Sequence, residues 1–297
     1  MDISQLRYFL EVARQRSFSR AAERLGVTQP ALSRAIGRLE QELGQTLLER
    51  QTRRVQLTEA GRLLCERATQ MLALHDDTLQ ELSRDVSRTL RIGAIPTICP
   101  YVVPKLLKRL RREFPDAKLI VSEKTTDALL KMCREGELQA ALVALPVAAR
   151  YLEIEPLVDE PLWLVVPASH RLAHGRQALS VEQLKGEPFI LLDEVHCLTQ
   201  SVVAFCRERH VQPLIVETAH QLETVLSLVA LGHGISFVPQ MAREARPYRN
   251  VVFRLMAEPR PSRRIALVWN PYRFQSRLAE AFRQTVHKYL AQSSTDS

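Results

Sequence analysis

The stretch FSRAAERLGVTQPALSRAIGRLEQELGQTLLER, residues 18–50, predicts two short helices joined by a tight turn. Ser19 is a candidate N-cap of the first helix, and Gly26 is the residue type that ends helices in the left-handed backbone conformation. Thr28 can cap the second helix, whose first turn tolerates Pro30. Apolar residues recur at helical spacing in both segments, so the stretch predicts a small helical domain with its own core.

The second of these helices starts with polar side chains, and a basic segment follows it. A polar helix start of this kind, placed after a turn, is typical of the recognition helix that enters the major groove of DNA. The basic segment LLERQTRRVQLT, residues 47–58, predicts a two-stranded wing whose arginines contact phosphates or the minor groove. The stripe leaves Gln29, Ser33, Arg34 and Arg38 on exposed faces of the second helix, and Arg50, Arg53 and Arg54 lie near the tip of the wing. The alternative is a helical domain with a solvated basic face, which leaves the coincidence of helix start, apolar stripe and wing unexplained.

Length and composition limit the classes of protein to consider. The chain has 297 residues, 46% of them hydrophobic, which suffices for two or three compact domains. No segment approaches the roughly 20 apolar residues of a membrane helix. The start MDISQLRYFL lacks a signal-peptide pattern, so we expect a cytoplasmic protein with no membrane contact. Five scattered cysteines are too few for a secreted disulfide framework, and the net charge of +8 suits double-stranded DNA as a polyanionic partner.

Residues 58–87 predict one long helix, because this segment contains no proline and no glycine after Gly61. The positions that recur at steps of three and four are Leu64, Ala68, Met71, His75, Leu79, Leu82 and Val86. This seam predicts a linker helix that joins two copies of the chain, so that a dimer presents two heads to a roughly palindromic DNA site. The alternative is a helix that packs against its own domain.

Beyond residue 88, strand-like apolar runs alternate with helical segments, which predicts an α/β domain with largely parallel sheets. Ligands of such sheets bind beyond the strand ends, so we expect a sensor site there. Thr97 follows the first predicted strand, and Thr126 stands near a helix start after the second. Their hydroxyls can bind a small polar ligand, or alternatively cap the helices.

The stretch DEVHCLTQSVVAFC, residues 193–206, places Cys197 near a predicted helix N-terminus and Cys206 nine positions later. A helix dipole and a hydrogen-bond donor favour the thiolate, which is the reactive form of cysteine. Nine helical steps rise about 13 Å and end on the opposite face of the helix. A disulfide needs α-carbons within about 7 Å, so joining the two cysteines would unwind the helix and convert an oxidation into a change of shape. The alternative is that both cysteines pack as small apolar residues.

Residues 3–61, in which LTEAG follows the opening stretch, resemble the winged helix-turn-helix of LysR-type transcriptional regulators. The resemblance implies that Thr28, Gln29, Pro30, Ser33 and Arg34 face DNA, while the wing residues Arg50, Arg53 and Arg54 contact its backbone. Leu48 stands where that family usually has phenylalanine, a difference expected to affect packing only. The resemblance implies an α/β protein with a winged helix-turn-helix and a two-lobed effector domain similar to periplasmic binding proteins. The implied domains are the head, residues 1–58; the linker and dimerisation helix, 59–88; and the effector domain, 89–297, with lobes at 89–163 plus 268–297 and at 164–267.

Within this family, IPTICPYVVP, HCL and a cysteine nine residues further on are similar to the OxyR-type hydrogen peroxide sensors. The resemblance implies that peroxide oxidises Cys197 to a sulfenic acid and that Cys206 then closes a disulfide. The implied effector pocket contains Thr97, Thr126, His196, Cys197 and Thr199. The OxyR pattern usually has arginine and aspartate where this chain has Thr199 and Gln200, which removes a thiolate-stabilising guanidinium and a proton acceptor.

The sequence therefore predicts a dimeric or tetrameric transcription regulator that is not an enzyme, needs no cofactor and contacts RNA polymerase. Its expected effector is hydrogen peroxide or, alternatively, a small metabolite bound between the lobes, with the cysteines incidental. A thiol peroxidase is disfavoured because the chain has a DNA-reading head and no CxxC pair. A metal site built from His196, Cys197, Cys206 and His210 is disfavoured because a helix would separate these ligands.

Overall fold

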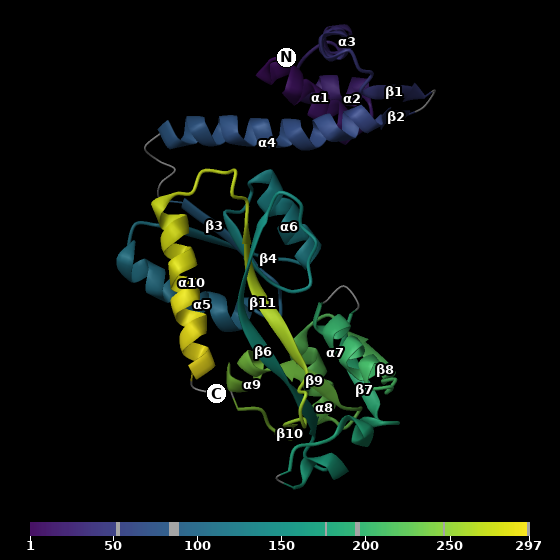
Figure 1. The fold of residues 1–297 in the computed structure, drawn as a ribbon, viewed down its shortest axis with the longest axis vertical. Coiled ribbons are helices and arrows are strands. Elements are labelled where there is room, and N and C mark those ends of the chain that lie inside the picture. Colours follow the sequence, from purple (N-terminus) through teal and green to yellow (C-terminus); the bar gives the residue numbers. More distant parts are fainter. Residues whose placement is uncertain (52–53, 83–88, 176, 194–196, 246, 296–297) are drawn as a thin grey trace. The chain divides into compact units, whose positions relative to one another are not determined.

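A computed structural model describes residues 1–297 except 52–53, 83–88, 176, 194–196, 246 and 296–297 (Figure 1). It also leaves undescribed the side chains of residues 50, 51, 54, 77, 80–82 and 292–295. The chain divides into two compact units, with the break near residue 86. None of the described helices is both long enough and apolar enough to cross a membrane.

The N-terminal unit begins with a helix-turn-helix and a wing. Its elements are α1 (Ile3–Gln15), α2 (Phe18–Leu25), α3 (Gln29–Leu43), β1 (Leu48–Gln51) and β2 (Arg54–Leu57). Phe9, Ile36 and Leu39 are fully buried in the core between the helices, and Leu48 joins the same core. β1 and β2 pair in antiparallel register and form the predicted wing.

The capping residues explain where α2 and α3 begin and end. Ser17, and not Ser19 as predicted, caps α2, and its Oγ accepts a backbone N–H of the first turn at 3.4 Å. The helix begins earlier than expected because Phe18 packs into the core. Gly26 ends α2 in the left-handed conformation at φ 66°. Thr28 caps α3 through its Oγ1, which accepts a backbone N–H at 3.4 Å, so the predicted caps on both sides of the turn are confirmed.

The helix α4 (Glu59–Leu82) follows the wing, and some of its apolar residues are buried in its own unit whereas others are exposed. Ala68 and Leu72 pack against Leu6 of α1, so this part of α4 belongs to the core of its own unit. The predicted seam was wrong for Ala68, which α1 covers, and Leu64 of the same seam also packs against the cores of its own unit. The large apolar side chains that remain exposed along the described part of α4 are Leu63, Met71, Leu74 and Leu79. Val86 and the side chain of Leu82 lie outside the described residues.

The effector unit is built around a mixed β-sheet. Its strands are β3 (Thr89–Ala94), β4 (Lys118–Glu123), β5 (Ala140–Ala144), β6 (Glu153–Pro167), β9 (Ser236–Pro239), β10 (Val251–Arg254) and β11 (Ser262–Trp269). They follow the order β10-β6-β11-β5-β3-β4, and β9 also pairs with β6. β3 pairs parallel with β4 and β5, whereas β6 and β11 pair antiparallel with their neighbours. The expectation of largely parallel sheets was therefore wrong here. The strand β11 comes from late in the chain and pairs antiparallel with both β5 and β6.

The strand β6 is continuous over residues 153–167, so the lobe boundary expected near residue 163 falls inside one strand. A parallel pair, β7 (Pro188–Leu192) and β8 (Leu214–Ala219), forms a second sheet. A bridge between Phe189 and Ile235 connects β7 to the segment that leads into β9. The core of the effector unit is thus continuous from β3 to β9.

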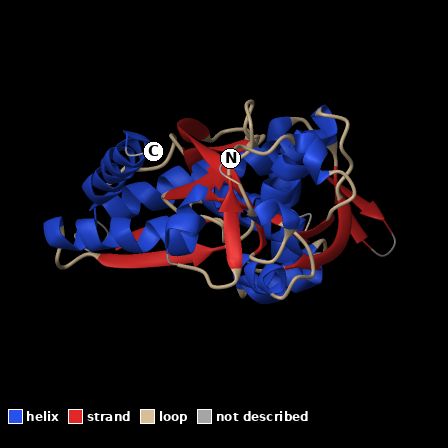
Figure 2. Ribbon diagram, turned by 90° about the horizontal axis from the view of Figure 1, so that it is seen from below, coloured by secondary structure: helices blue, strands red, loops and turns tan. Residues whose placement is uncertain are grey.

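Helices flank these strands (Figure 2). They are α5 (Cys99–Glu113), α6 (Thr126–Glu135), α7 (Cys197–Glu208), α8 (Leu222–Ala230), α9 (Gln240–Ala245) and α10 (Arg277–Thr295), with short 3-10 helices at Arg171–Ala173 and Val181–Leu184. Phe205 of α7 meets Phe237 of β9 edge to face, with 6.0 Å between the ring centroids. This contact fixes which face of α7 is buried and which face remains available for a site.

Candidate sensor site and DNA-binding surface

Helix α7 carries both predicted redox cysteines. Cys197 is its first residue and is half-buried, whereas Cys206 lies near its end and is fully buried. Because the helix is continuous between them, their α-carbons are separated by about 13 Å along the axis and lie on opposite faces. A disulfide needs α-carbons within about 7 Å, so the two cysteines cannot join while α7 is folded.

A cavity of about 330 Å³ lies beside Cys197. The described residues that line it come from three segments. The N-cap and first part of α6 contribute Thr125, Thr126, Asp127 and Leu130, and the end of β5 with the loop after it contributes Ala144, Pro146, Val147 and Ala148. Helix α7 contributes Cys197 and Gln200. The structure thus brings Thr126 and Cys197 to one cavity, as expected from the rule that strand ends meet at one edge of a sheet. Applied to the strand that ends at Ala144, the same rule would also have predicted residues 146–148 as part of the cavity lining.

The start of α6 contributes polar groups to this cavity. Thr125 is the N-cap residue, but its side chain makes no capping hydrogen bond, and Thr126 is the first residue of the helix. Asp127 places a carboxylate in the first turn, where the helix dipole favours a negative charge. Neither threonine therefore serves the capping role that was the alternative interpretation of Thr126.

Thr97 is not among the described residues that line this cavity, so its assignment to the effector pocket stays a prediction. It is buried, and its Oγ1 and carbonyl oxygen accept hydrogen bonds from the Arg263 guanidinium at 2.5 and 3.0 Å. The Nε of Arg263 also donates to Glu160 at 2.7 Å. Thr97 is thus part of a buried ion-pair cluster that sequence reasoning missed. The sequence does contain a sign of this cluster, because Arg263 alternates along β11 with the buried residue Ile265 and so lies on the buried face of the strand.

Thr199 is also absent from the described lining of the cavity. Its side chain is buried, and its Oγ1 donates to the carbonyl oxygen of Leu192 at 2.6 Å. The hydroxyl therefore ties the first turn of α7 to the end of β7, and its role in the effector pocket stays a prediction. His196, the remaining predicted pocket residue, lies outside the described residues.

Burial disfavours the thiolate at the other four cysteines. Burial raises the pKa of Cys206 to about 11, although the charge of Arg209 opposes this shift. Burial raises the pKa of Cys133 to about 12, and burial together with the Glu123 carboxylate raises that of Cys99 to about 12. The pKa of Cys65 is raised by burial and by the Glu66 charge. These thiols stay protonated at neutral pH in the folded chain.

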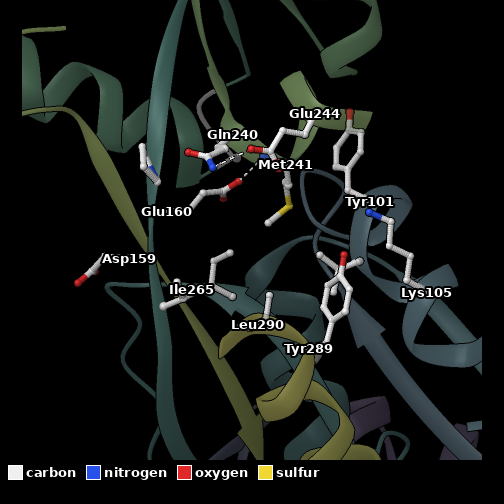
Figure 3. A pocket seen from close by; sticks show the side chains of 13 residues that line it. Tyr101, Lys105, Asp159, Glu160, Gln240, Met241, Glu244, Ile265, Tyr289 and Leu290 are labelled. Carbon is white, nitrogen blue, oxygen red and sulfur yellow. Dashed lines mark hydrogen bonds between the residues drawn. The ribbon is translucent and has the colours of Figure 1, made fainter. Parts of the chain in front are cut away.

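A smaller cavity of about 180 Å³ lies between α5, β6, β11, α9 and α10 (Figure 3). Tyr101 and Tyr289 form part of its wall, and Met241 lies opposite. Glu160 borders it and accepts the Met241 backbone N–H at 2.9 Å. Since Glu160 also pairs with Arg263, the buried ion-pair cluster that holds Thr97 forms one edge of this cavity.

The predicted DNA-contacting residues of α3 lie on the surface of the head. Thr28, Gln29, Pro30 and Arg34 are exposed, and Ser33 is half-buried. In the wing, Arg50 lies on β1 and Arg54 on β2, but their side chains are outside the described part of the structure, as is all of Arg53. The start of α3 therefore presents amide, hydroxyl and guanidinium groups together, as a recognition helix requires.

The two units define a class of protein, in which a winged helix-turn-helix head is followed by a long helix and an α/β effector unit with a ligand-sized cavity. Residues 3–62 match the bacterial regulatory helix-turn-helix proteins of the lysR family, and residues 83–291 match the LysR substrate binding domain. The chain therefore belongs to the LysR family of DNA-binding transcription regulators. Members of this family are regulators and not enzymes.

Similar proteins are named as peroxide-responsive regulators. The hydrogen peroxide-inducible genes activator of Dickeya chrysanthemi is 36% identical over 276 residues, which are 91% of this chain and 90% of that protein. Full-length OxyR from Pseudomonas aeruginosa, with a cysteine-to-aspartate substitution, gives a TM-score of 0.70 at 30% identity and covers 96% of this chain and 94% of its own. A hydrogen peroxide-bound cysteine-to-serine mutant of OxyR from Corynebacterium glutamicum gives 0.59 at 30% identity and covers 99% and 97%.

Proposed function

We propose that this LysR-family regulator responds to hydrogen peroxide through Cys197 and Cys206. The observation that carries the proposal is the placement of the two thiols on α7. Cys197 is half-buried at the start of the helix and lines a cavity, whereas Cys206 is fully buried near the other end of the same helix. The names of the similar proteins support the choice of peroxide as the effector.

The proposed reaction proceeds in two balanced steps. The Cys197 thiolate attacks one oxygen of hydrogen peroxide, the O–O bond breaks, and the other oxygen takes up a proton and leaves as water. This step leaves a sulfenic acid on Cys197. The Cys206 sulfur then displaces the sulfenic oxygen, which leaves as a second water, and the disulfide forms. Overall, two thiols are oxidised and one peroxide is reduced to two waters.

The second step requires α7 to unwind. Because burial raises the pKa of Cys206 to about 11, that thiol is a poor first target for peroxide and acts after the helix opens. Unwinding withdraws Leu198, Val202 and Phe205 from the core. The oxidised effector unit therefore has a different surface, which is the local event a regulator needs to signal.

We further propose that the regulator works as a homodimer or homotetramer that contacts RNA polymerase on promoter DNA. The support for self-association is that α4 leaves four large apolar side chains exposed, namely Leu63, Met71, Leu74 and Leu79. Exposed apolar surface of this kind marks a candidate contact with another protein chain. A shape change at α7 would then alter the spacing of two DNA-binding heads.

The redox proposal predicts a specific disulfide. Brief treatment of the reduced full-length protein with near-stoichiometric hydrogen peroxide is expected to remove two hydrogens, and peptide mapping by mass spectrometry is expected to place the link between Cys197 and Cys206. The variant Cys206→Ser should stop at a sulfenic acid on Cys197, because the second thiol is missing. The variant Cys65→Ser is the matched control and should form the disulfide normally.

If both thiols stay reduced until peroxide is in large excess, the redox proposal is overturned. A regulator that binds a small metabolite in the cavity beside Thr126 would then take its place. Full transcriptional responsiveness of a Cys197→Ser variant would favour the same conclusion.

The DNA-binding surface gives an independent prediction. Arg34→Ala and Gln29→Ala are each expected to reduce the discrimination between operator and random DNA by about 1–3 kcal/mol, because these side chains read base edges. Arg53→Ala is expected to weaken binding to all DNA similarly and to lower the salt dependence, because the wing contacts phosphates. Fluorescence anisotropy titrations at several salt concentrations measure both quantities. Equal losses on operator and random DNA for Arg34→Ala would refute its base-reading role.

A further inference from the structure

The cavity beside Cys197 is much larger than hydrogen peroxide requires. A water molecule has a share of roughly 30 Å³ in the liquid, and a cavity of about 150 Å³ already holds a benzene molecule. Hydrogen peroxide has only two heavy atoms, whereas this cavity measures about 330 Å³. Its volume therefore fits a molecule with an alkyl or aryl body.

The described wall of the cavity is divided into a polar and an apolar part. The polar groups come from the start of α6 and from α7, where Cys197 itself lies. The apolar part consists of Leu130, Ala144, Pro146, Val147 and Ala148. Pro146 and Ala148 are exposed, so an apolar body that covered them would be favoured by the hydrophobic effect.

The charge of the described lining residues limits the ligand further. Asp127 is the one ionisable oxygen acid among them, and they include no lysine or arginine. The Asp127 carboxylate already occupies the first turn of α6, where the helix dipole would otherwise attract an anion. The described part of the lining is therefore suited to a neutral ligand and opposes one that carries a carboxylate.

We propose that the Cys197 cavity also accepts neutral organic hydroperoxides, whose alkyl or aryl group lies against Leu130, Pro146, Val147 and Ala148. This inference rests on the proposed redox function of Cys197. The thiolate attacks the terminal oxygen of R–O–O–H, the O–O bond breaks, and the RO group takes up a proton and leaves as the alcohol. Cys197 is oxidised to a sulfenic acid, the hydroperoxide is reduced to the alcohol, and the disulfide with Cys206 forms with release of water.

The test compares the reduced full-length protein oxidised by cumene hydroperoxide and by hydrogen peroxide, with quenched samples analysed for the Cys197–Cys206 disulfide by mass spectrometry. Wild-type protein is expected to form the disulfide with both. Ala148→Phe fills the apolar part of the cavity, so it is expected to lower the ratio of the cumene hydroperoxide rate to the hydrogen peroxide rate by about tenfold or more. Ala168→Phe is the matched control, because Ala168 is exposed and is not among the lining residues. It should leave that ratio unchanged.

The expected preference for a neutral ligand is tested with a second variant, at Asp127. Cumene hydroperoxide that carries a para-carboxylate is expected to react more slowly than the neutral compound, and Asp127→Asn should bring the two rates closer together, since the variant removes the opposing charge.

Four outcomes distinguish the inference from the proposed function. A disulfide with both oxidants and a ratio lowered by Ala148→Phe supports the inference. Oxidation by hydrogen peroxide alone overturns it and leaves the proposed function standing. Oxidation by both with the same ratio in wild type, Ala148→Phe and Ala168→Phe also overturns it. Oxidation by neither overturns the redox function, and this inference with it.

Discussion

Replacing Arg263 with methionine is expected to lower the free energy of unfolding of the effector unit by about 3–5 kcal/mol. Arg263 on β11 stands directly opposite Glu160 on β6, and its side chain has no exposed surface. The guanidinium donates to the Glu160 carboxylate at 2.7 Å and to both oxygens of Thr97. Its removal leaves a buried carboxylate without a counter-charge and leaves Thr97 without its donors.

The next residue along β11 offers a matched control. Arg264 stands opposite Asp159 in the same two strands and makes hydrogen bonds of 2.6 and 2.8 Å to it. These two side chains are each 55% exposed, because neighbouring residues of a strand point to opposite faces. Arg264→Met is therefore expected to cost far less stability than Arg263→Met, since water already screens the exposed pair.

Urea unfolding followed by tryptophan fluorescence measures this difference in the full chain. Both tryptophans, Trp163 on β6 and Trp269 on β11, lie in the effector unit, so their signal reports on that unit. The double variant Arg263→Met with Glu160→Met should recover most of the lost stability, because no buried charge then lacks a partner. Equal losses for Arg263→Met and Arg264→Met would show that burial of the pair has no energetic consequence.

The helix-turn-helix is predictable from sequence because its determinants are local. Gly26 and Thr28 act on backbone groups within a few residues of themselves, so their residue types are enough to predict a helix end and a helix start. The shift of the α2 cap from Ser19 to Ser17 shows the limit of this reasoning. Burial of Phe18 decides where α2 begins, and burial depends on the whole head.

The lining of the cavity beside Cys197 is only partly predictable because it depends on contacts between distant residues. The general rule for strand ends brings Thr126 and Cys197 to one cavity, although 71 positions (197 − 126) separate them. The rule does not say which hydroxyls are already engaged. Thr97 is held by Arg263, which lies 166 positions further along the chain, and no pattern near Thr97 indicates this partner.

The head gives the second large effect. Gly61→Ala is expected to lower the free energy of unfolding of the head by about 3 kcal/mol, because it forces a steric overlap in a packed region. A Cβ on Gly61 would lie 2.1 Å from the Leu47 carbonyl oxygen and 3.1 Å from the Leu57 side chain. The carbonyl cannot easily move, since it accepts the Thr58 N–H at 3.1 Å and the Thr58 hydroxyl at 3.2 Å. The same hydroxyl accepts the Gly61 N–H at 2.9 Å, which holds the start of α4 close to this carbonyl. Because the carbonyl stays in place, the added methyl group would push α4 away from the wing and strain these hydrogen bonds.

Gly37→Ala in α3 is the matched control, because a Cβ there meets nothing within 4 Å. Alanine in the interior of a helix is expected to stabilise the head by about 0.5–1 kcal/mol relative to glycine. Hydrogen exchange measured by mass spectrometry on peptides from α1 to α3 resolves the head from the rest of the chain, and protection should fall in Gly61→Ala and rise in Gly37→Ala. If these amides are equally protected in both variants, the close approach of α4 to Leu47 does not stabilise the head. The presence of glycine at position 61 would then need another explanation.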